Sequence, residues 1–456
     1  MSSRENLRPQ SPELAAAWES LEAGDVPAAL RKIRHSADTL PLGEVALVVE
    51  RAADSAGFDD LKQASAKLAG EPEDGLSLFE FGYACIERGL SYLAVPAMRE
   101  VLRQSPDAVA PLRELVAAYE TETRHREAAD LLLAHEAALV DWPDRYLLVF
   151  NALMAGDLEL ANRQYALLTA PDDARWLPAR DRLARMLRRA AAAAPATALD
   201  RDDLRGWQFV IGGTVLGTLS PYGFADGMRG RYAWIQDSYG ECLRGLRRLR
   251  TVLAAAGLQP RSISLLPDRD SRILGLAAAE VFGLPAEPFA AGRQDTVVIA
   301  YNLDGVIGEE TRAEGGEALR ALLLGRAPGQ VLHEHASCWT DAPPLTADSV
   351  ALLYQSLVPP WGARLRQNGD GQVEQTVVDD RSVEELAAEI VRAEPPFDAD
   401  AGTGDGEADD GANDDGAPAD TDERLSAFVS AVRADWLQGG RPPMPSTGPV
   451  SSSRFL

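Results

Sequence analysis

The stretch "SISLLPDRDSRILGLAAAEVFGL" (262–284) decides the fold of the second half of the chain. It begins with five apolar or small residues, typical of a short buried strand. From Ser271 onward its apolar residues recur at helical spacing. The polar loop "PDRDSR" (267–272) separates the two segments. A strand, a loop and a helix in this order are typical of a βαβ unit in a parallel sheet.

The neighbouring segments repeat this alternation. "TVVIAYNL" (296–303) and "QVLHEHAS" (330–337) are typical of two more buried strands. "GGEALRALLLG" (315–325) and a leucine-spaced stretch over about 231–256 are typical of helices. This alternation predicts right-handed crossovers and a mainly parallel sheet covered on both faces. We assign this α/β domain to residues 201–394.

The beginning of this domain is rich in glycine. "WQFVIGGTVLGTLS" (207–220) has β-branched residues broken by glycines, which predicts a strand pair or a bulged hairpin. Because "GGTVLG" opens no predicted helix, it is not a dinucleotide-binding fingerprint. The patterns GxxxxGK[ST], HExxH and GxSxG do not occur either. The sequence therefore predicts no cofactor.

Two loops of the α/β domain are candidate binding loops, because ligands of parallel sheets bind beyond the carboxyl ends of the strands. Ser271 is suited to cap the following helix, whose amides could hold an anion together with Arg269 or Arg272. The alternative is simple capping, with both arginines in solvent. The predicted ligand-binding residues are Asp268, Arg269, Asp270, Ser271, Arg272, Asn302 and Asp304, and Glu309 and Glu310 follow in the second loop.

The run "SLLPDRDSRILGLAAAEVFGLPAEPF", followed by "VVIAYNLDG", resembles the phosphoribosyltransferase family over about 260–340. The resemblance implies an α/β scaffold and a nucleotide-like or phosphorylated ligand. The diphosphate-sugar loop of that family has two adjacent acids followed by Thr and Gly. Here "AYNLDGVIGEE" has the single acid Asp304 at that place, so the resemblance extends to the scaffold and not to phosphoribosyl transfer.

Two of the five histidines lie in the predicted strand "VLHEHASCWTD" (331–341). Because side chains alternate along a strand, His333 and His335 share one face, while Glu334 and Cys338 share the other. His333 and His335 are the candidate metal ligands. Two ligands do not complete a zinc site, so the sequence predicts neutral, hydrogen-bonded histidines and no metal.

The first half of the chain is repetitive. "LFEFGYACIERGLSYLAVPAMREVLRQSP" (78–106) predicts two amphipathic helices joined by a turn at Gly89. Similar turns fall near 24, 57, 123 and 156, a step of 32 to 34 residues, each followed by a small residue. This pattern resembles the tetratricopeptide repeat (TPR) family. The resemblance implies an all-α solenoid of about five repeats and a capping helix over 11–193, with a concave groove that holds a protein partner.

The end of the chain is acidic. Of the formal net charge of −25, nearly half comes from twelve carboxylates between Glu394 and Glu423, a stretch without Lys or Arg. This composition predicts a disordered acidic linker over 395–423. It is followed by a short amphipathic helix over 424–437 and a disordered tail over 438–456. We expect a chain without residues 395–456 to keep a folded body.

Composition excludes several classes of function. No basic patch suits nucleic acid, and no apolar run reaches the length of a membrane span. Three scattered cysteines and a polar N-terminus favour a cytoplasmic protein without disulfides. Three functions remain open. The first is a protein-interaction scaffold whose α/β domain binds a nucleotide-like or phosphorylated ligand, or only a protein. The second is an enzyme acting on a nucleotide or sugar phosphate and targeted by the repeats. The third is a metal-dependent hydrolase centred on residues 331–341.

Overall fold

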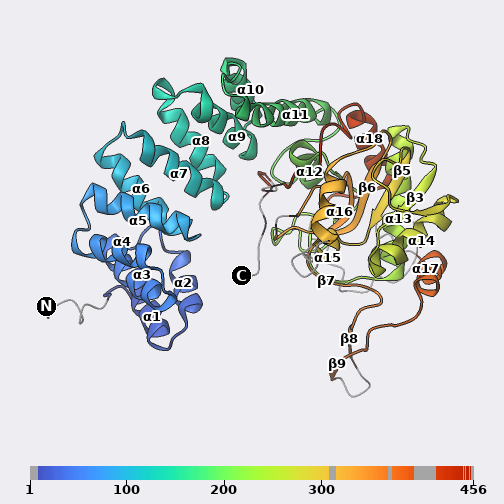
Figure 1. Cartoon of the computed structure of the whole chain (residues 1–456), viewed down its shortest axis with the longest axis horizontal. Coiled ribbons are helices and arrows are strands. Elements are labelled where there is room, and N and C mark those ends of the chain that lie inside the picture. The colour runs from blue at the N-terminus through green and yellow to red at the C-terminus, as the bar shows by residue number, and fades with distance from the viewer. Residues whose placement is uncertain are drawn as a thin grey trace. The chain divides into compact units, whose positions relative to one another are not determined.

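The computed structural model describes residues 9–307, 315–341, 343–367, 372–394, 417–444, 446, 448–450 and 452. Contacts within the chain divide it into two compact units, Met1–Leu177 and Pro178–Leu456, which are described one at a time (Figure 1). Glu309, Glu310 and most of the predicted acidic linker lie outside the described residues.

The first unit consists of helices that contact one another in chain order. α1 packs on α2, α3 on α4, α5 on α6, α7 on α8 and α9 on α10, and each pair also contacts the next. The helices are α1 (Pro12–Glu22), α2 (Val26–Arg34), α3 (Leu42–Ala56), α4 (Asp59–Gly70), α5 (Gly75–Glu87), α6 (Ser91–Gln104), α7 (Val109–Thr121), α8 (His125–Ala134), α9 (Tyr146–Met154) and α10 (Leu158–Leu167).

The predicted turns are confirmed by the backbone of the first unit. Gly24, Gly57, Gly89 and Gly156 all have a positive φ, between 72° and 81°, which glycine adopts without strain. At the remaining turn Thr123 takes this conformation, with φ 55°. The small residues after the turns are fully buried where two helices meet: Ala29, Ala94, Ala128 and Ala161.

The second unit is an α/β fold whose chain segment begins and ends with further helices. Its helices are α11 (Leu177–Ala193), α12 (Leu204–Gly212), α13 (Tyr239–Ala256), α14 (Arg269–Phe282), α15 (Leu303–Ile307), α16 (Gly315–Leu324), α17 (Val383–Arg392) and α18 (Asp422–Val432). Its strands are β1 (Val215–Leu216), β2 (Tyr232–Gln236), β3 (Ser262–Leu265), β4 (Ala286–Pro288), β5 (Thr296–Ala300), β6 (Val331–Cys338), β7 (Ser349–Val358), β8 (Leu365–Gln367) and β9 (Val373–Gln375). By its contacts α11 belongs here, whereas the sequence placed residues 177–193 in the first domain.

The main sheet is parallel, with strand order β1-β7-β6-β5-β3-β4, and β2 pairs with β7 beyond β1. From β3 the chain passes through α14 outward to β4; it then returns to β5 and proceeds in the opposite direction to β6 and β7. Right-handed crossovers in opposite directions place α13 and α14 on one face and α15 and α16 on the other (Figure 1). The order of the strands therefore reverses between β3 and β5. This is the switch point at which open α/β sheets bind ligands.

The predictions for residues 207–220 and 231–256 are wrong in part. Residues 204–212 form helix α12, because Asp203 caps it through the Gly206 N–H and its apolar residues are buried. Only Val215–Leu216 are strand, after Gly213 ends the helix with φ 77°. Within the helix predicted over 231–256, residues 232–236 form strand β2, and helix α13 begins only at Tyr239, after its cap Ser238. We predicted no strand over 349–358, where β7 lies.

The C-terminal segment is part of the folded unit. α18 buries Leu425, Phe428, Val429 and Val432, and Phe428 packs edge-on against Phe209 of α12. The predicted disordered tail is wrong for residues 438–444, since Arg441 is 2% exposed and paired with Asp348. No helix in the described ranges has both the length and the hydropathy that crossing a membrane requires.

Candidate functional site

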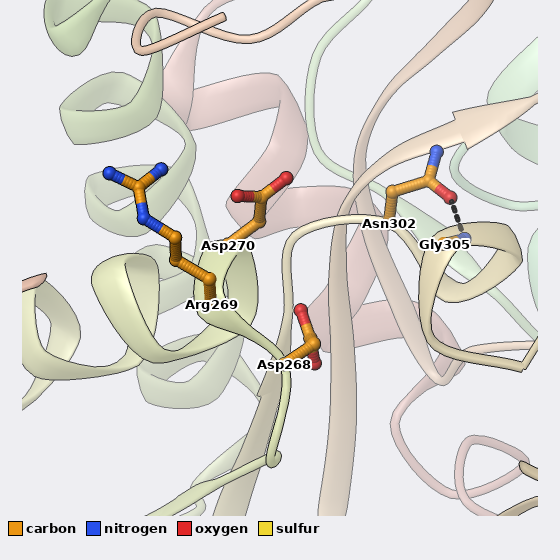
Figure 2. A pocket seen from close by; sticks show the side chains of 5 residues that line it. All are labelled: Asp268, Arg269, Asp270, Asn302 and Gly305. Atoms are coloured by element: carbon orange, nitrogen blue, oxygen red, sulfur yellow. Dashed lines mark hydrogen bonds between the residues drawn. The ribbon is translucent and has the colours of Figure 1, made fainter. Parts of the chain in front are cut away.

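A cavity of about 220 Å³ opens at the switch point of the sheet. Three of its lining residues, Asp268, Arg269 and Asp270, belong to the loop after β3 and the first turn of α14. The other two, Asn302 and Gly305, lie at the junction of β5 and α15 (Figure 2). The structure thus brings four of the seven predicted ligand-binding residues together, and these four come from the two loops that the sequence singled out.

The loop after β3 is held by two side chains. Asp268, and not Ser271 as predicted, caps α14: its Oδ2 accepts a hydrogen bond of 2.8 Å from the Ser271 N–H. Ser271 is fully buried, and its Oγ accepts a hydrogen bond from the Tyr301 N–H. This second bond joins the first turn of α14 to the end of β5. Ser271 therefore shapes the cavity without lining it.

The arginines do not form the predicted anion site. Arg269 donates to the backbone carbonyls of Asp379 and Arg381, at 2.7 and 3.2 Å. Arg272 is exposed on α14. Figure 2 shows the Arg269 guanidinium turned away from Asp268 and Asn302. Arg269, the basic side chain among the residues that line the cavity, thus donates its hydrogen bonds to backbone oxygens.

Two carboxyl groups give the cavity its acidic character. Asp268 Oδ1 is buried and has no hydrogen-bond partner in the described part of the chain. Asp270 Oδ1 accepts a hydrogen bond of 2.7 Å from the Trp361 indole N–H. Burial raises the pKa of Asp270 above its ordinary value, and the nearby charge of Asp268 raises it further. A ligand that donates hydrogen bonds would satisfy both groups.

Asn302 completes the lining with a fixed amide. Its Oδ1 accepts a hydrogen bond of 3.0 Å from the Gly305 N–H, the dashed line in Figure 2, and its Nδ2 donates to the Tyr354 hydroxyl. Asp304 does not line the cavity. Its pKa is raised by burial and by the charge of Asp341.

The sequence did not single out Glu334 as a site residue. This residue of β6 is 2% exposed, and its Oε1 accepts a hydrogen bond of 2.7 Å from the Leu303 N–H, directly after Asn302. Burial raises its pKa to about 8. The only available signal was a carboxylate between the two histidines of a predicted buried strand.

The two histidines of β6 share a face as predicted, but each has its own surroundings. His333 Nδ1 lies 3.2 Å from Ser349 Oγ, and burial and the nearby His335 lower its pKa to about 3. His335 Nε2 lies 3.0 Å from Asp237 Oδ2. Cys338 contacts Thr340 and does not join them.

The cavity therefore offers carboxylate oxygens and a fixed amide at the carboxyl ends of two parallel strands. This arrangement suits hydroxyl or amino groups better than a bare anion, because charge-assisted hydrogen bonds to carboxylates are strong and its arginine is engaged elsewhere. Comparison of the chain with family models, with curated proteins and with solved structures gives no match.

Proposed function

We propose that the second unit binds the ribose of a nucleoside or nucleotide in the cavity lined by Asp268, Asp270 and Asn302. One observation carries the proposal: the cavity lies at the switch point between β3 and β5, where open α/β sheets bind their ligands. The sequence resemblance to phosphoribosyltransferases over about 260–340 favours the same class of ligand.

The chemistry of the lining favours the sugar as the anchored part. Carboxylates accept hydrogen bonds from vicinal hydroxyls, as in dinucleotide sites where an acidic residue binds the ribose. The cavity of about 220 Å³ is smaller than the roughly 300–1,000 Å³ of sites that enclose a whole drug-sized ligand. The cavity has room for one sugar ring, and the rest of the ligand would lie outside it.

Substitution of Asp268 and Asp270 tests this site. Asp268→Asn keeps a good helix cap, and Asp270→Asn keeps an acceptor for Trp361, so each removes charge with little structural change. Loss of one hydrogen bond to a charged group is worth about 1.5–3 kcal/mol, so we expect roughly 10- to 100-fold weaker binding. Thermal shift and calorimetry with nucleosides, nucleotides, free ribose and sugar phosphates measure the change.

Arg272→Gln is the matched control, since Arg272 is exposed on the same helix. It should bind as the wild type does. A panel in which no compound raises the unfolding temperature, or a ligand whose affinity neither Asp variant changes, contradicts the proposal.

An enzyme that acts on the same ligand is the second candidate function. The observation that favours it is the group of carboxyls with raised pKa beside the cavity, Asp270, Asp304 and Glu334. Such groups gather at catalytic sites, and a pKa of about 8 suits an acid–base role near neutral pH. The ligand panel separates the two functions, because a binding protein returns the ligand unchanged and an enzyme converts it.

We propose further that the first unit is a TPR-like solenoid that recruits a protein partner, and that the chain acts as a scaffold in the cytoplasm. α5, the first helix of its pair, carries an apolar stripe at helical spacing: Leu76, Phe79 and Tyr83. Leu76 is 58% and Tyr83 44% exposed, and the rings of Phe79 and Tyr83 stack. A stripe of this kind is suited to an apolar face of a partner helix.

Partner capture tests the scaffold. We expect the full chain to retain a reproducible partner from a cytoplasmic extract, and a chain without residues 11–173 to lose it. Tyr83→Glu should lose the same partner, because it places a charge in the apolar stripe. Arg103→Glu, on the exposed surface of α6, is the control and should keep it. A partner that is equally retained by the Tyr83→Glu chain would exclude α5 as the docking helix.

A further inference from the structure

Away from the cavity, three side chains of metal-binding types meet in the core of the second unit. Asp237 follows β2, Cys242 lies in the first turns of α13, and His335 lies on β6. All three are fully buried. The chain distances of 93 and 98 residues from His335 to Cys242 and Asp237 mean that only the fold brings them together.

The ligand atoms of these residues form a compact triangle. His335 Nε2 lies 3.0 Å from Asp237 Oδ2 and 3.9 Å from Cys242 Sγ, and Cys242 Sγ lies 3.4 Å from Asp237 Oδ2. Zinc bonds of about 2.0–2.3 Å in tetrahedral geometry separate neighbouring ligand atoms by about 3.3–3.6 Å. The triangle therefore has about the size of one face of a zinc tetrahedron.

We propose that Asp237, Cys242 and His335 bind a divalent metal ion of intermediate softness, with zinc as the best fit. One oxygen, one nitrogen and one sulfur ligand match the preferences of zinc. They do not suit magnesium or calcium, which take oxygen ligands. Cys242 binds as the thiolate, and its proton leaves to solvent.

The surroundings orient these three ligands. Asp237 Oδ2 accepts a hydrogen bond of 2.8 Å from the Tyr301 hydroxyl, and its Oδ1 accepts one of 2.8 Å from the Ser238 N–H. Metal-bound carboxylates commonly have such outer partners. The His335 ring stacks on Tyr301 with a centroid distance of 5.3 Å. A Cβ added at Gly245 would lie 2.8 Å from His335 Nδ1, so the ring fits at this position because residue 245 has no side chain.

The three side chains would supply three of the four tetrahedral positions, and a water molecule would fill the fourth. Because all three side chains are completely buried, an ion here would stabilise the fold and would not meet a substrate. An ion here fastens the end of β2 and the start of α13 to β6. The same cluster also supports the cavity: Tyr301 lies against Trp361, with ring centroids 5.1 Å apart, and Trp361 donates to Asp270. Metal binding is thus expected to stabilise the cavity wall without contacting the ligand.

Cobalt titration of the full chain tests the site. After treatment with a chelator, the wild type should bind one Co²⁺ per chain, with a thiolate-to-cobalt charge-transfer band and the visible bands of tetrahedral cobalt. Zinc should displace the cobalt and remove both. Cys242→Ser should abolish the charge-transfer band, whereas Cys338→Ser, which changes another buried cysteine of the same unit, should keep it.

If Cys242→Ser does not fold, the zinc content of the untreated wild type, measured by elemental analysis, tests the site instead. About one zinc per chain supports the site. A wild type with neither zinc nor a cobalt band overturns it, as does a band that persists in Cys242→Ser. In that case hydrogen bonds from Tyr301, Ser238, Cys242 and His335 to Asp237 account for the cluster.

Discussion

A chain that ends at residue 416 is expected to lose the folded second unit. Five large apolar side chains between residues 425 and 436 are buried, and burial of each stabilises the fold by about 1.5–3 kcal/mol. Their sum, on the order of 8–15 kcal/mol, reaches the roughly 5–15 kcal/mol that holds a whole protein folded. The residues are Leu425, Phe428, Val429, Val432 and Trp436.

The truncation also removes the carboxylate that pairs with two buried arginines. Arg205 and Arg248 both pair with Asp420, at 2.6 and 2.5 Å, and all three side chains are less than 10% exposed. A buried arginine without its ion-pair partner destabilises the folded state. This loss of stability adds to the loss of the buried apolar side chains. Our expectation from the sequence, that the body stays folded without residues 395–456, is therefore replaced by the opposite expectation.

Hydrogen-exchange mass spectrometry measures this outcome one segment at a time. Peptides of β6 and β7 should exchange as unfolded chain, or the protein should aggregate. A chain that ends at residue 452 is the control, because it keeps α18 and Arg441. Protected β6 and β7 peptides in the shorter chain would show that α18 is dispensable.

Asp348→Asn is expected to have the largest effect of any single substitution proposed for the second unit. Asp348 Oδ2 lies 2.6 Å from Arg441 Nη2 and accepts a hydrogen bond of 2.8 Å from the Leu332 N–H, while Oδ1 pairs with Arg326. The carboxylate thus joins the C-terminal segment to β6 and to the loop after α16. Removing one member of a buried ion pair costs about 3–5 kcal/mol, because the other charge stays buried alone.

The loss of stability caused by Asp348→Asn should depend on pH. Burial alone would raise the pKa of Asp348, but the charges and hydrogen bonds of Arg441 and Arg326 hold it below its ordinary value. A carboxyl group with a lowered pKa in the folded state adds stability above its unfolded pKa, about 3.9, and loses it as the pH falls through the folded value. The difference in free energy of unfolding between wild type and variant should be largest at pH 7 and should shrink below about pH 4.

The loss in free energy of unfolding is measured at each pH by urea unfolding. Hydrogen exchange of the β6 and β7 peptides is the readout for the second unit. Glu317→Ala breaks an exposed pair with Arg320 on α16 and should leave the midpoint unchanged. A midpoint for Asp348→Asn equal to that of the wild type at pH 7 would mean that the pair with Arg441 contributes nothing.

β3 and β5 could be predicted because each is a short run of apolar and small residues between polar loops. Nearly all residues of these strands and of β6 are buried within the parallel sheet, and short buried runs of this kind are the local signal for such strands. The same reasoning failed at α12, where "VIGGTVLG" has the composition of a strand. There a cap at Asp203 and the burial of Trp207 override the local preference.

The site could be predicted by position but not by chemistry. Both Asp268 and Ser271 are good helix caps, and the choice between them depends on Tyr301, whose N–H engages Ser271. The engagement of Arg269 depends on carbonyls 110 and 112 residues away. Such long-range contacts leave no local pattern, which is why the sequence indicated an anion site and the structure offers carboxylates.

The most direct test of the ligand site is a crystal structure of the full chain with the tightest-binding ribose compound of the panel. We predict density for the sugar beyond the carboxyl ends of β3 and β5, with its hydroxyls within hydrogen-bond distance of the carboxylates of Asp268 and Asp270. Density for the ligand elsewhere on the chain, with this cavity empty at a saturating concentration, would contradict the proposed function.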